Sequence, residues 1–290
     1  MRDAVTLEAP AKVNLYLEVG AKRRDGYHDV RTVLQAVELC DLVEVEVSGG
    51  VGGIDLEVQG EAPAGEDNLC HRAAEAFLEA SGKGWDVRIG LVKRIPAAAG
   101  LGGGSSDAAA VLRGLNFLAG EALDRPGLMR LAASLGTDVP FFLVGGTALG
   151  EGRGERVTPL PQAPPLPLVL ANPGIPLSTA DVYRRFDEGG GGESPLGSAE
   201  VMGEALRGGD ARRVAALLFN SLQPAACALA PQVGALLERA LWAGAMGALV
   251  SGSGPTVFML AGDEGQAEEL EKEMGRYAPL VVRIRFRSSG

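Results

Sequence analysis

The residues best suited to chemistry lie in a glycine-rich segment from Pro96 to Ser106. Four glycines fall within five residues: Gly100, Gly102, Gly103 and Gly104. Glycine lets the backbone adopt positive φ and approach a ligand closely, because it has no Cβ. We therefore expect a loop whose backbone N–H groups bind phosphate, and the alternative is a structural turn before a helix.

The element that positions this loop is a helix. Ser105 or Ser106 is a suitable N-cap, and the alanine-rich run after them predicts a helix from Ser105 to about Leu118. Its N-terminus adds the positive end of the helix dipole to the loop. No Gly-Lys-Ser/Thr follows the glycines, and the Gly-x-Gly-x-x-Gly spacing fails at Ser105. The segment is therefore neither a Walker A loop nor a dinucleotide fingerprint.

Two polar residues share one face of a strand predicted over residues 4 to 19. The sequence alternates with period two from Lys12 onward, so its apolar residues form one face: Val13, Leu15, Leu17 and Val19. Lys12 and Asn14 point together from the other face. On the pattern alone, an ordinary solvated strand face is the favoured interpretation.

A basic loop, residues 20 to 29, follows this strand. Residues 12 to 31 carry a net charge of +2 within a chain whose net charge is −10, so they supply local positive charge for an anionic ligand. The loop presents Tyr27 and His28, which could stack on a ring and form hydrogen bonds with it. A surface turn explains the pair equally well.

An acidic residue, Asp138, precedes an apolar run. Gly136 is the expected end of a helix over 126 to 135, and Pro140 favours an extended Val139. We therefore expect Asp138 in a short loop between a helix and a strand over 139 to 143. A turn-forming aspartate bonded to its own backbone is the alternative.

Composition limits the class of protein. A chain of 290 residues with 46% hydrophobic residues, and with no apolar run of membrane length, predicts a soluble protein with no membrane partner. The net charge of −10 argues against a nucleic-acid partner. The N-terminus lacks the pattern of an export signal, and three widely spaced cysteines suggest no disulfide framework, so we expect a cytoplasmic protein. No signal for an oligomeric state is evident.

The order of the expected strands and helices, together with a change in composition, predicts an α+β protein with two domains. Glycine and proline accumulate over residues 150 to 167, and we place the boundary there, giving domains 1–157 and 158–290. The order of strands and helices after residue 166 predicts a ferredoxin-like sheet with helical insertions, including helices over 199–207, 210–222 and 231–243. A hairpin turn is favoured for Gly252–Gly254, with a second anion contact as the alternative.

Three separated segments resemble the GHMP kinase superfamily, which includes galactokinase, homoserine kinase, mevalonate kinase and phosphomevalonate kinase. They are the glycine loop with its helix, Leu135–Leu143 and Ser251–Pro255. Within the superfamily, Ala9–Leu15 together with Arg24–His28 is similar to the kinases of a CDP-linked methylerythritol. The resemblance covers nearly the whole chain. It implies a ribosomal-protein-S5-like N-terminal domain and a ferredoxin-like C-terminal domain.

The resemblance also implies an activity and its residues. The reaction is transfer of phosphate from ATP, with Mg²⁺ carried by ATP, to the 2-hydroxyl of the CDP-linked methylerythritol in the non-mevalonate isoprenoid pathway. Lys12 and Asp138 match the catalytic pair, and Asn14 and Thr137 lie beside the reacting polyol. The ATP-binding positions are Pro96, Ala97, Ala98, Ala99, Gly100, Leu101, Gly102, Gly103, Gly104, Ser105, Ser106 and Asn68. No metal ligands are assigned in the chain.

The cytidine site implied by the resemblance contains Tyr27, His28 and Tyr183, with Phe186 as an alternative to Tyr183 for stacking on the cytosine. A glycine insertion, Gly189–Gly192, departs from the family's pattern beside it. The competing functions are a mevalonate or homoserine kinase, a non-catalytic nucleotide sensor and a dinucleotide-dependent oxidoreductase. Gly26–His28 argues against the first, and the presence of both Lys12 and Asp138 argues against the second. The glycine spacing argues against the third.

Overall fold

The structure is a computed structural model that describes residues 3–190 and 198–288. The chain forms two compact units, each assembled from segments far apart in sequence. Unit 1 contains residues 1–11, 39–97 and 102–144, and unit 2 contains residues 12–38, 98–101 and 145–290. Two long strands, β1 (Asp3–Lys22) and β2 (His28–Gly49), contribute to both units. These units are not the two sequence domains expected above. The domain boundary at 157/158 therefore stays a prediction.

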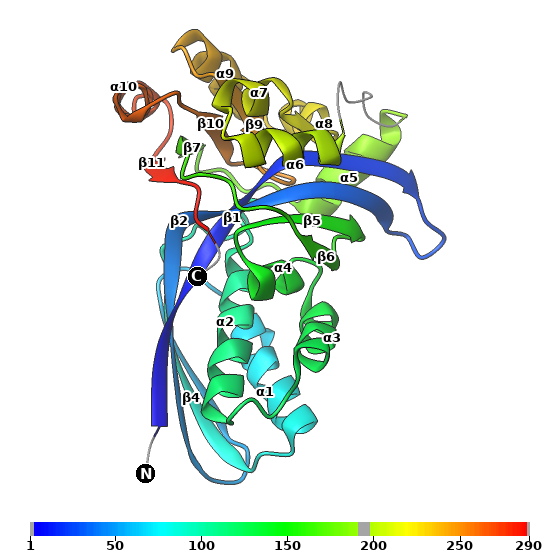
Figure 1. The fold of residues 1–290 in the computed structure, drawn as a ribbon, viewed down its shortest axis with the longest axis vertical. Coiled ribbons are helices and arrows are strands. Elements are labelled where there is room, and N and C mark those ends of the chain that lie inside the picture. Colours follow the sequence, from blue (N-terminus) through cyan, green and yellow to red (C-terminus); the bar gives the residue numbers. More distant parts are fainter. Residues whose placement is uncertain (1–2, 191–197, 289–290) are drawn as a thin grey trace. The chain divides into compact units, whose positions relative to one another are not determined.

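Unit 1 is a sheet covered by helices (Figure 1). Its strands β3 (Ile54–Gln59) and β4 (Trp85–Val92) run parallel, and β4 pairs antiparallel with β2 from Leu42↔Val92 to Gly49↔Trp85. The helices of the unit follow β3 and β4 in the chain: η1 (Gly65–Asp67), α1 (Leu69–Ser81), α2 (Gly103–Leu118), α3 (Arg125–Leu135) and α4 (Val139–Val144).

Helix α2 is the central element of unit 1. The run from Ser106 to Leu112 is buried on every side, which small alanine side chains permit. Gly114 lets the helix approach the sheet, because a Cβ there would lie 3.0 Å from Leu7 Cδ1 and 3.2 Å from Val45 Cγ2. The sequence of this helix therefore specifies a core element rather than an amphipathic surface helix.

Two expectations for unit 1 are wrong. Helix α2 begins at Gly103 with Gly102 as N-cap, so Ser105 and Ser106 lie in its first turn and neither is the cap. Residues after Asp138 form α4 rather than a strand. Pro140 lies in the first turn of this helix, where its missing N–H has no intrahelical acceptor to lose.

Unit 2 contains the other halves of β1 and β2. Strand β2 pairs with β5 (Thr147–Gly152) from Val30↔Gly152 to Gln35↔Thr147, and β5 pairs with β6 (Arg156–Pro159). Strand β1 pairs in parallel with the short β8 (Phe219–Asn220) at Tyr16↔Phe219. These pairings fix the start of the chain beside segments that follow it by more than a hundred residues.

The second sheet of unit 2 confirms the ferredoxin-like prediction. Its antiparallel order is β11-β7-β10-β9, formed by β7 (Pro167–Asn172), β9 (Gly247–Val250), β10 (Val257–Leu260) and β11 (Leu280–Arg285). The helices of this half are inserted between β7 and β9 or follow β10: α5 (Thr179–Glu188), α6 (Ala199–Gly208), α7 (Ala211–Ala216), α8 (Gln223–Leu229), α9 (Pro231–Trp242) and α10 (Glu264–Met274).

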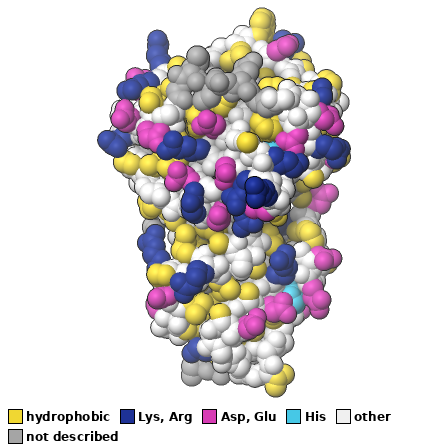
Figure 2. Space-filling view, turned by 90° about the vertical axis from the view of Figure 1, so that its right-hand side faces the viewer, with side chains coloured by type: hydrophobic (Ala, Val, Ile, Leu, Met, Phe, Trp, Pro, Cys, Tyr) yellow, Lys and Arg dark blue, Asp and Glu magenta, His cyan; other side chains and the backbone are white. Residues whose placement is uncertain are grey.

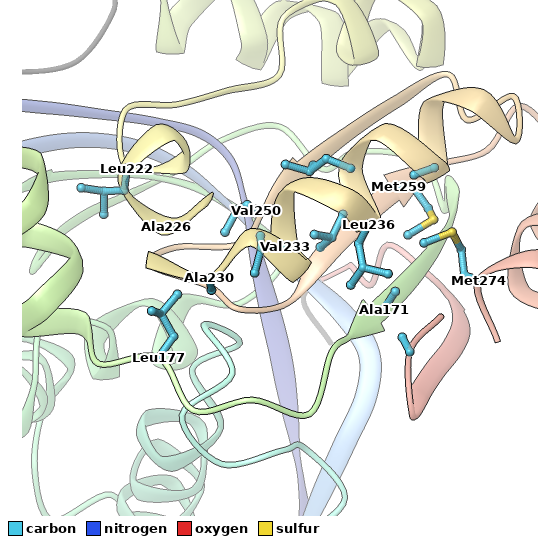
Figure 3. Close-up of a cluster of buried hydrophobic side chains, with 14 of the residues drawn as sticks. Ala171, Leu177, Leu222, Ala226, Ala230, Val233, Leu236, Val250, Met259 and Met274 are labelled. Atoms are coloured by element: carbon cyan, nitrogen blue, oxygen red, sulfur yellow. The ribbon is translucent and has the colours of Figure 1, made fainter. Parts of the chain in front are cut away.

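One helix of unit 2 is shorter than expected. The helix expected over 210–222 ends at Ala216 as α7, because the chain turns there to pair β8 with β1. The hydrophobic core of this half is a cluster of side chains that includes Leu236, Val250 and Met259 (Figure 3). Gly191 and Gly192 of the predicted glycine insertion lie outside the described residues.

Two further features concern the length of the described helices and the charge on the surface. None of the helices over 3–190 and 198–288 is long and apolar enough to cross a membrane. On the face drawn in Figure 2, basic and acidic side chains of the described residues are interspersed.

Candidate functional site

Residues 98–101 of the glycine loop belong to unit 2, where a second loop holds them. Ser251 Oγ donates to the Gly100 carbonyl oxygen at 2.9 Å, and Lys12 N donates to the Leu101 carbonyl oxygen at 3.0 Å. Gly100 has φ of 77°, and a Cβ there would lie 2.2 Å from the Ser251 carbonyl oxygen. Only glycine fits this position. The Ser251 loop is thus a hairpin turn, as favoured from sequence, that also supports the glycine loop.

The second half of the loop belongs to unit 1 and opens helix α2. Gly102 has φ of 73°, and the first loop-to-helix hydrogen bond runs from Ser106 N to the Gly102 carbonyl oxygen at 2.9 Å. The N–H groups of Gly103, Gly104 and Ser105 therefore precede the first intrahelical bond and can serve an anion. This geometry is what phosphate binding requires.

Two side-chain oxygens in the first two turns of α2 are also available. Ser106 Oγ and Asp107 Oδ1 are buried and have no hydrogen-bond partner within the described part of the chain. A buried polar atom without a partner costs free energy, so such atoms commonly mark a site completed by a ligand. The serine hydroxyl can donate to a phosphate oxygen.

A buried ionic network lies beside the second half of the loop. Lys93 Nζ donates to Asp41 Oδ2 and, at 2.7 Å, to Asp107 Oδ2. These three side chains are 6%, 0% and 3% exposed. Burial raises the pKa of Asp107 to about 7, and the positive charge of Lys93 opposes that shift. A Cβ on Gly103 would lie 3.1 Å from Lys93 Nζ, so the network supports the loop from within unit 1.

The two catalytic candidates belong to different units. In unit 2, Lys12 is buried, and its Nζ donates to Asn14 Oδ1 at 2.6 Å. Asn14 Nδ2 donates to Thr32 Oγ1 at 2.9 Å, which orients the amide. A Cβ on Gly252 would lie 3.4 Å from Lys12 Nζ, so the Ser251 loop also passes close to this amine. Lys12 and Asn14 point together as the strand pattern predicts, but both are buried, so the favoured interpretation of this face as solvated is wrong.

In unit 1, Thr137 and Asp138 are half-buried and directly precede α4. The Asp138 carbonyl oxygen accepts from Phe141 N at 3.2 Å, which ties the residue to the first turn of the helix. Asp138 thus lies on a rigid support, although that support is a helix rather than the expected strand.

Asn68 has a clear structural role. Its Oδ1 accepts from Cys70 N at 2.9 Å as the N-cap of α1, and its Nδ2 donates to the Pro63 carbonyl oxygen at 2.8 Å. Asn68 therefore opens α1. Its assignment to ATP stays a prediction.

Unit 2 brings His28 together with the aromatic residues of α5. The His28 ring is buried, 5.1 Å from the Tyr183 ring at a 34° tilt and 6.0 Å from the Phe186 ring in an edge-on arrangement. Phe186 is 6% exposed and belongs to the hydrophobic core, whereas Tyr183 is only partly buried against it. Tyr183 is therefore the better placed of the two for stacking on a ligand.

Tyr27 takes a different position from His28. It is 54% exposed, and the Arg153 guanidinium lies over its ring at 5.1 Å. The pair combines a flat ring with a cation, an arrangement that suits an aromatic and anionic ligand. The loop thus offers one buried and one exposed ring.

Sequence reasoning missed several residues. Asp187 accepts from the buried His28, Lys93 and Asp41 lie under the loop, and Ser251 holds it. One signal was available: Asp187 is four residues after Tyr183, so the two share a helix face. Asp41 lies on β2 and Lys93 directly follows β4, 52 positions later, and no local pattern links them.

Two family models match the chain. The model described as "GHMP kinases N terminal domain" matches residues 68–146, and "GHMP kinases C terminal" matches residues 202–280. The first match includes the glycine loop and Asp138, and the second includes the Ser251 loop.

Relatives resemble the chain over most of its length. A protein of Pelotomaculum thermopropionicum named 4-diphosphocytidyl-2-C-methyl-D-erythritol kinase is 47% identical over 92% of both chains. One of Deinococcus radiodurans with the same name is 44% identical over 93% of this chain and 89% of that protein. A crystal structure of 4-(cytidine 5'-diphospho)-2C-methyl-D-erythritol kinase matches with a TM-score of 0.84 and 38% identity over 99% of this chain and 100% of that one. Homoserine kinase from Cytophaga hutchinsonii matches at 0.75 with 21% identity over 99% of this chain and 96% of that one, which shows the fold alone.

Proposed function

The chain belongs to the 4-diphosphocytidyl-2-C-methyl-D-erythritol kinases of the GHMP kinase family, and we propose that its described residues form the site for that reaction. The protein is a small-molecule kinase that phosphorylates the CDP-linked methylerythritol in isoprenoid synthesis. The finer proposal is that ATP is the donor and the 2-hydroxyl the acceptor. The observation that carries the substrate class is the buried His28 ring held against Tyr183.

ATP binds through its phosphates at the glycine loop. The N–H groups of Gly103, Gly104 and Ser105, with the Ser106 hydroxyl, serve the phosphate oxygens, and Mg²⁺ enters as part of the ATP substrate. Among the described residues, no group of three or more His, Cys, Asp and Glu side chains could hold a metal ion. Gly103→Val should weaken ATP affinity in calorimetry, and unchanged affinity in a folded variant would remove the loop from the phosphate site.

Lys12 and Asp138 carry the phosphoryl transfer. The Asp138 carboxylate accepts the proton of the attacking hydroxyl, and the Lys12 amine stabilises negative charge on the transferring group. Asn14 orients the amine through its 2.6 Å hydrogen bond. Because the transition state is loose, the base contributes modestly, and Asp138→Asn should retain slight activity.

The cytidyl group binds at His28, Tyr27 and Tyr183. The rings offer stacking surfaces, and the Arg153 cation near Tyr27 suits the diphosphate side of the ligand. His28→Ala should then raise the KM for the CDP-linked substrate far more than that for ATP. Equal effects on both would indicate a structural loop.

We also place the protein in the cytoplasm. Cys40, Cys70 and Cys227 are free thiols, and no disulfide links them in the described chain, which suits a reducing compartment.

A coupled ADP-release assay tests the function directly. The CDP-linked methylerythritol, mevalonate and homoserine are offered in parallel with ATP. We expect turnover with the first and at most traces with the others. Turnover with mevalonate or homoserine alone would overturn the proposed substrate.

A double-mutant cycle tests the catalytic pair. If Lys12 and Asp138 serve one transition state, Lys12→Ala with Asp138→Ala should cost little more kcat than the worse single variant, with nucleotide binding retained. Fully multiplicative losses would show independent roles. Near wild-type turnover in Asp138→Asn would exclude the catalytic base.

A further inference from the structure

The carboxylate of Asp187 on α5 is bonded to His28 and has no part in the function proposed above. Asp187 Oδ1 lies 2.7 Å from His28 Nε2, and Asp187 Oδ2 accepts from Lys22 Nζ at 2.7 Å. Both oxygens are therefore engaged, one by the ring and one by the basic loop. The His28 side chain is 4% exposed, so this bond fixes a buried ring.

The ionisation of Asp187 decides which ring nitrogen carries the proton. The hydrogen bond from Lys22 lowers the pKa of Asp187, and the bond from His28 lowers it further, so the group is a carboxylate at neutral pH. A carboxylate can only accept hydrogen bonds. The proton in the 2.7 Å contact therefore resides on His28 Nε2.

The other ring nitrogen is left for a ligand. Among residues 3–190 and 198–288, the His28 ring bonds to Asp187 through Nε2, and Nδ1 is the ring nitrogen outside that bond. Contacts with Tyr183 and Phe186, together with the Asp187 bond, restrict rotation of the ring. In the neutral ring with Nε2 protonated, Nδ1 is an acceptor that needs a donor.

We propose that Asp187 is a positioning residue that gives this kinase its preference for cytosine over uracil, by holding His28 in the tautomer whose Nδ1 accepts a hydrogen bond. Cytosine carries an amino donor where uracil carries a carbonyl acceptor. An acceptor at Nδ1 therefore binds the first base and repels the second. The inference rests on the proposed cytidyl site at His28.

Asp187→Asn keeps the size and shape of the side chain but exchanges donor and acceptor in its contact with His28 Nε2. Lys22 has only donors, so the amide oxygen stays with Lys22 and the amide N–H₂ faces His28 Nε2. Nε2 must then accept, and the ring proton moves to Nδ1. A matched control is Glu188→Gln, which neutralises the neighbouring carboxylate; Glu188 pairs with Arg185 at 3.5 Å on the same helix, whereas Asp187 pairs with His28.

The first measurement is the tautomer in the free protein, by ¹⁵N NMR of labelled histidine at mildly alkaline pH. The chain has two histidines, so a His71→Gln variant assigns the spectrum. We expect Nε2–H in the wild type and Glu188→Gln, and Nδ1–H in Asp187→Asn. A wild-type ring protonated on Nδ1 would overturn the proposal, whatever the protein's substrate.

The second measurement is kinetic, with CDP-linked and UDP-linked methylerythritol as alternative substrates and thermal melting as a folding check. In Asp187→Asn we expect the KM for the CDP-linked substrate to rise about tenfold or more, with kcat and the KM for ATP nearly unchanged. The preference for CDP over UDP should fall by a similar factor, and Glu188→Gln should match the wild type.

The outcomes separate the two proposals. A tautomer that switches while the CDP preference stays constant would overturn the role of Asp187 in specificity. Equal loss with both substrates would also overturn it and assign Asp187 a structural role. A wild type without activity on either pyrimidine-linked substrate would instead refute the proposed function.

Discussion

Two networks built around lysine and aspartate shift the pKa of an aspartate in opposite directions. In unit 1, Lys93 lies between Asp41 and Asp107, and all three side chains are at most 6% exposed. In unit 2, Lys22 and His28 share Asp187, and the Lys22 side chain is 56% exposed. The pKa of Asp107 is raised and that of Asp187 is lowered.

Burial decides whether the pKa of the aspartate is raised or lowered. For Asp107, the loss of hydration outweighs the attraction of Lys93, and its Oδ1 has no partner in the described chain. For Asp187, solvent supports the charge and two hydrogen bonds add to it. The same residue types therefore give a stability-critical network in one unit and a site-orienting network in the other.

The largest expected effect comes from Lys93→Met. It leaves Asp41 and Asp107 buried without their shared cation, which should cost about 3–5 kcal/mol of unfolding free energy. Urea denaturation measures the loss, and adding Asp107→Asn should recover part of it by removing one carboxylate. A single variant as stable as the wild type would refute the importance of the buried network.

Asp107→Asn should change the pH dependence of stability. The folded-state pKa of Asp107 is raised from 3.8 to about 7, so its contribution is present below about pH 4 and is lost as pH rises through about 7. The variant should gain over the wild type by at most about 4 kcal/mol above neutral pH, and by little near pH 4. Unfolding at several pH values checks this, and a constant difference would contradict it.

Gly103→Ala tests how firmly the buried network is held. The new Cβ would lie 3.0 Å from Ile95 Cγ2 and 3.1 Å from Lys93 Nζ, which its two aspartates fix in place. We expect a loss of about 1–2 kcal/mol in thermal unfolding. Gly104→Ala is the control, because its Cβ would lie 3.7 Å from Leu69 Cδ1, an ordinary contact. Equal stability of the two variants would show that the Lys93 side chain moves to make room for the new Cβ.

The smallest effect is expected for Lys22→Met. This exposed ion pair should contribute less than about 1 kcal/mol to stability, and that contribution should shrink further in high salt. Melting curves of Lys22→Met and Lys93→Met under one buffer condition compare the two networks directly. A larger loss of stability in Lys22→Met than in Lys93→Met would contradict the conclusion that the buried network contributes more.

Local patterns predicted much of the fold. Alternation identified the strand containing Lys12 and Asn14, and the order of elements after residue 166 identified the ferredoxin-like sheet. Prediction failed at 139–143, where an apolar run of strand composition forms α4. A short apolar segment fits either structure, and packing rather than propensity decides between them.

For the candidate site, the residues with distinctive spacing were found, and those that depend on tertiary contacts were not. The glycines at 100 and 102 have the positive φ that their type suggests, but Ala98, with φ of 49°, carries no such signal. The bond from Lys93 to Asp41 joins the residue after β4 to β2, and the bond from Asp187 to His28 joins α5 to the first residue of β2. Neither pair is visible until the chain is folded.

The hydrogen bond from Ser251 to Gly100 has a consequence for synthesis of the protein on the ribosome. It joins residues 151 positions apart, and the bond from Val19 N to Ser221 Oγ joins residues 202 positions apart. Residues 98–101 therefore cannot gain their support until the segment around Ser251 has been translated and has left the ribosome. A nascent chain stopped before that point holds every residue of the glycine loop but lacks the contacts that shape it.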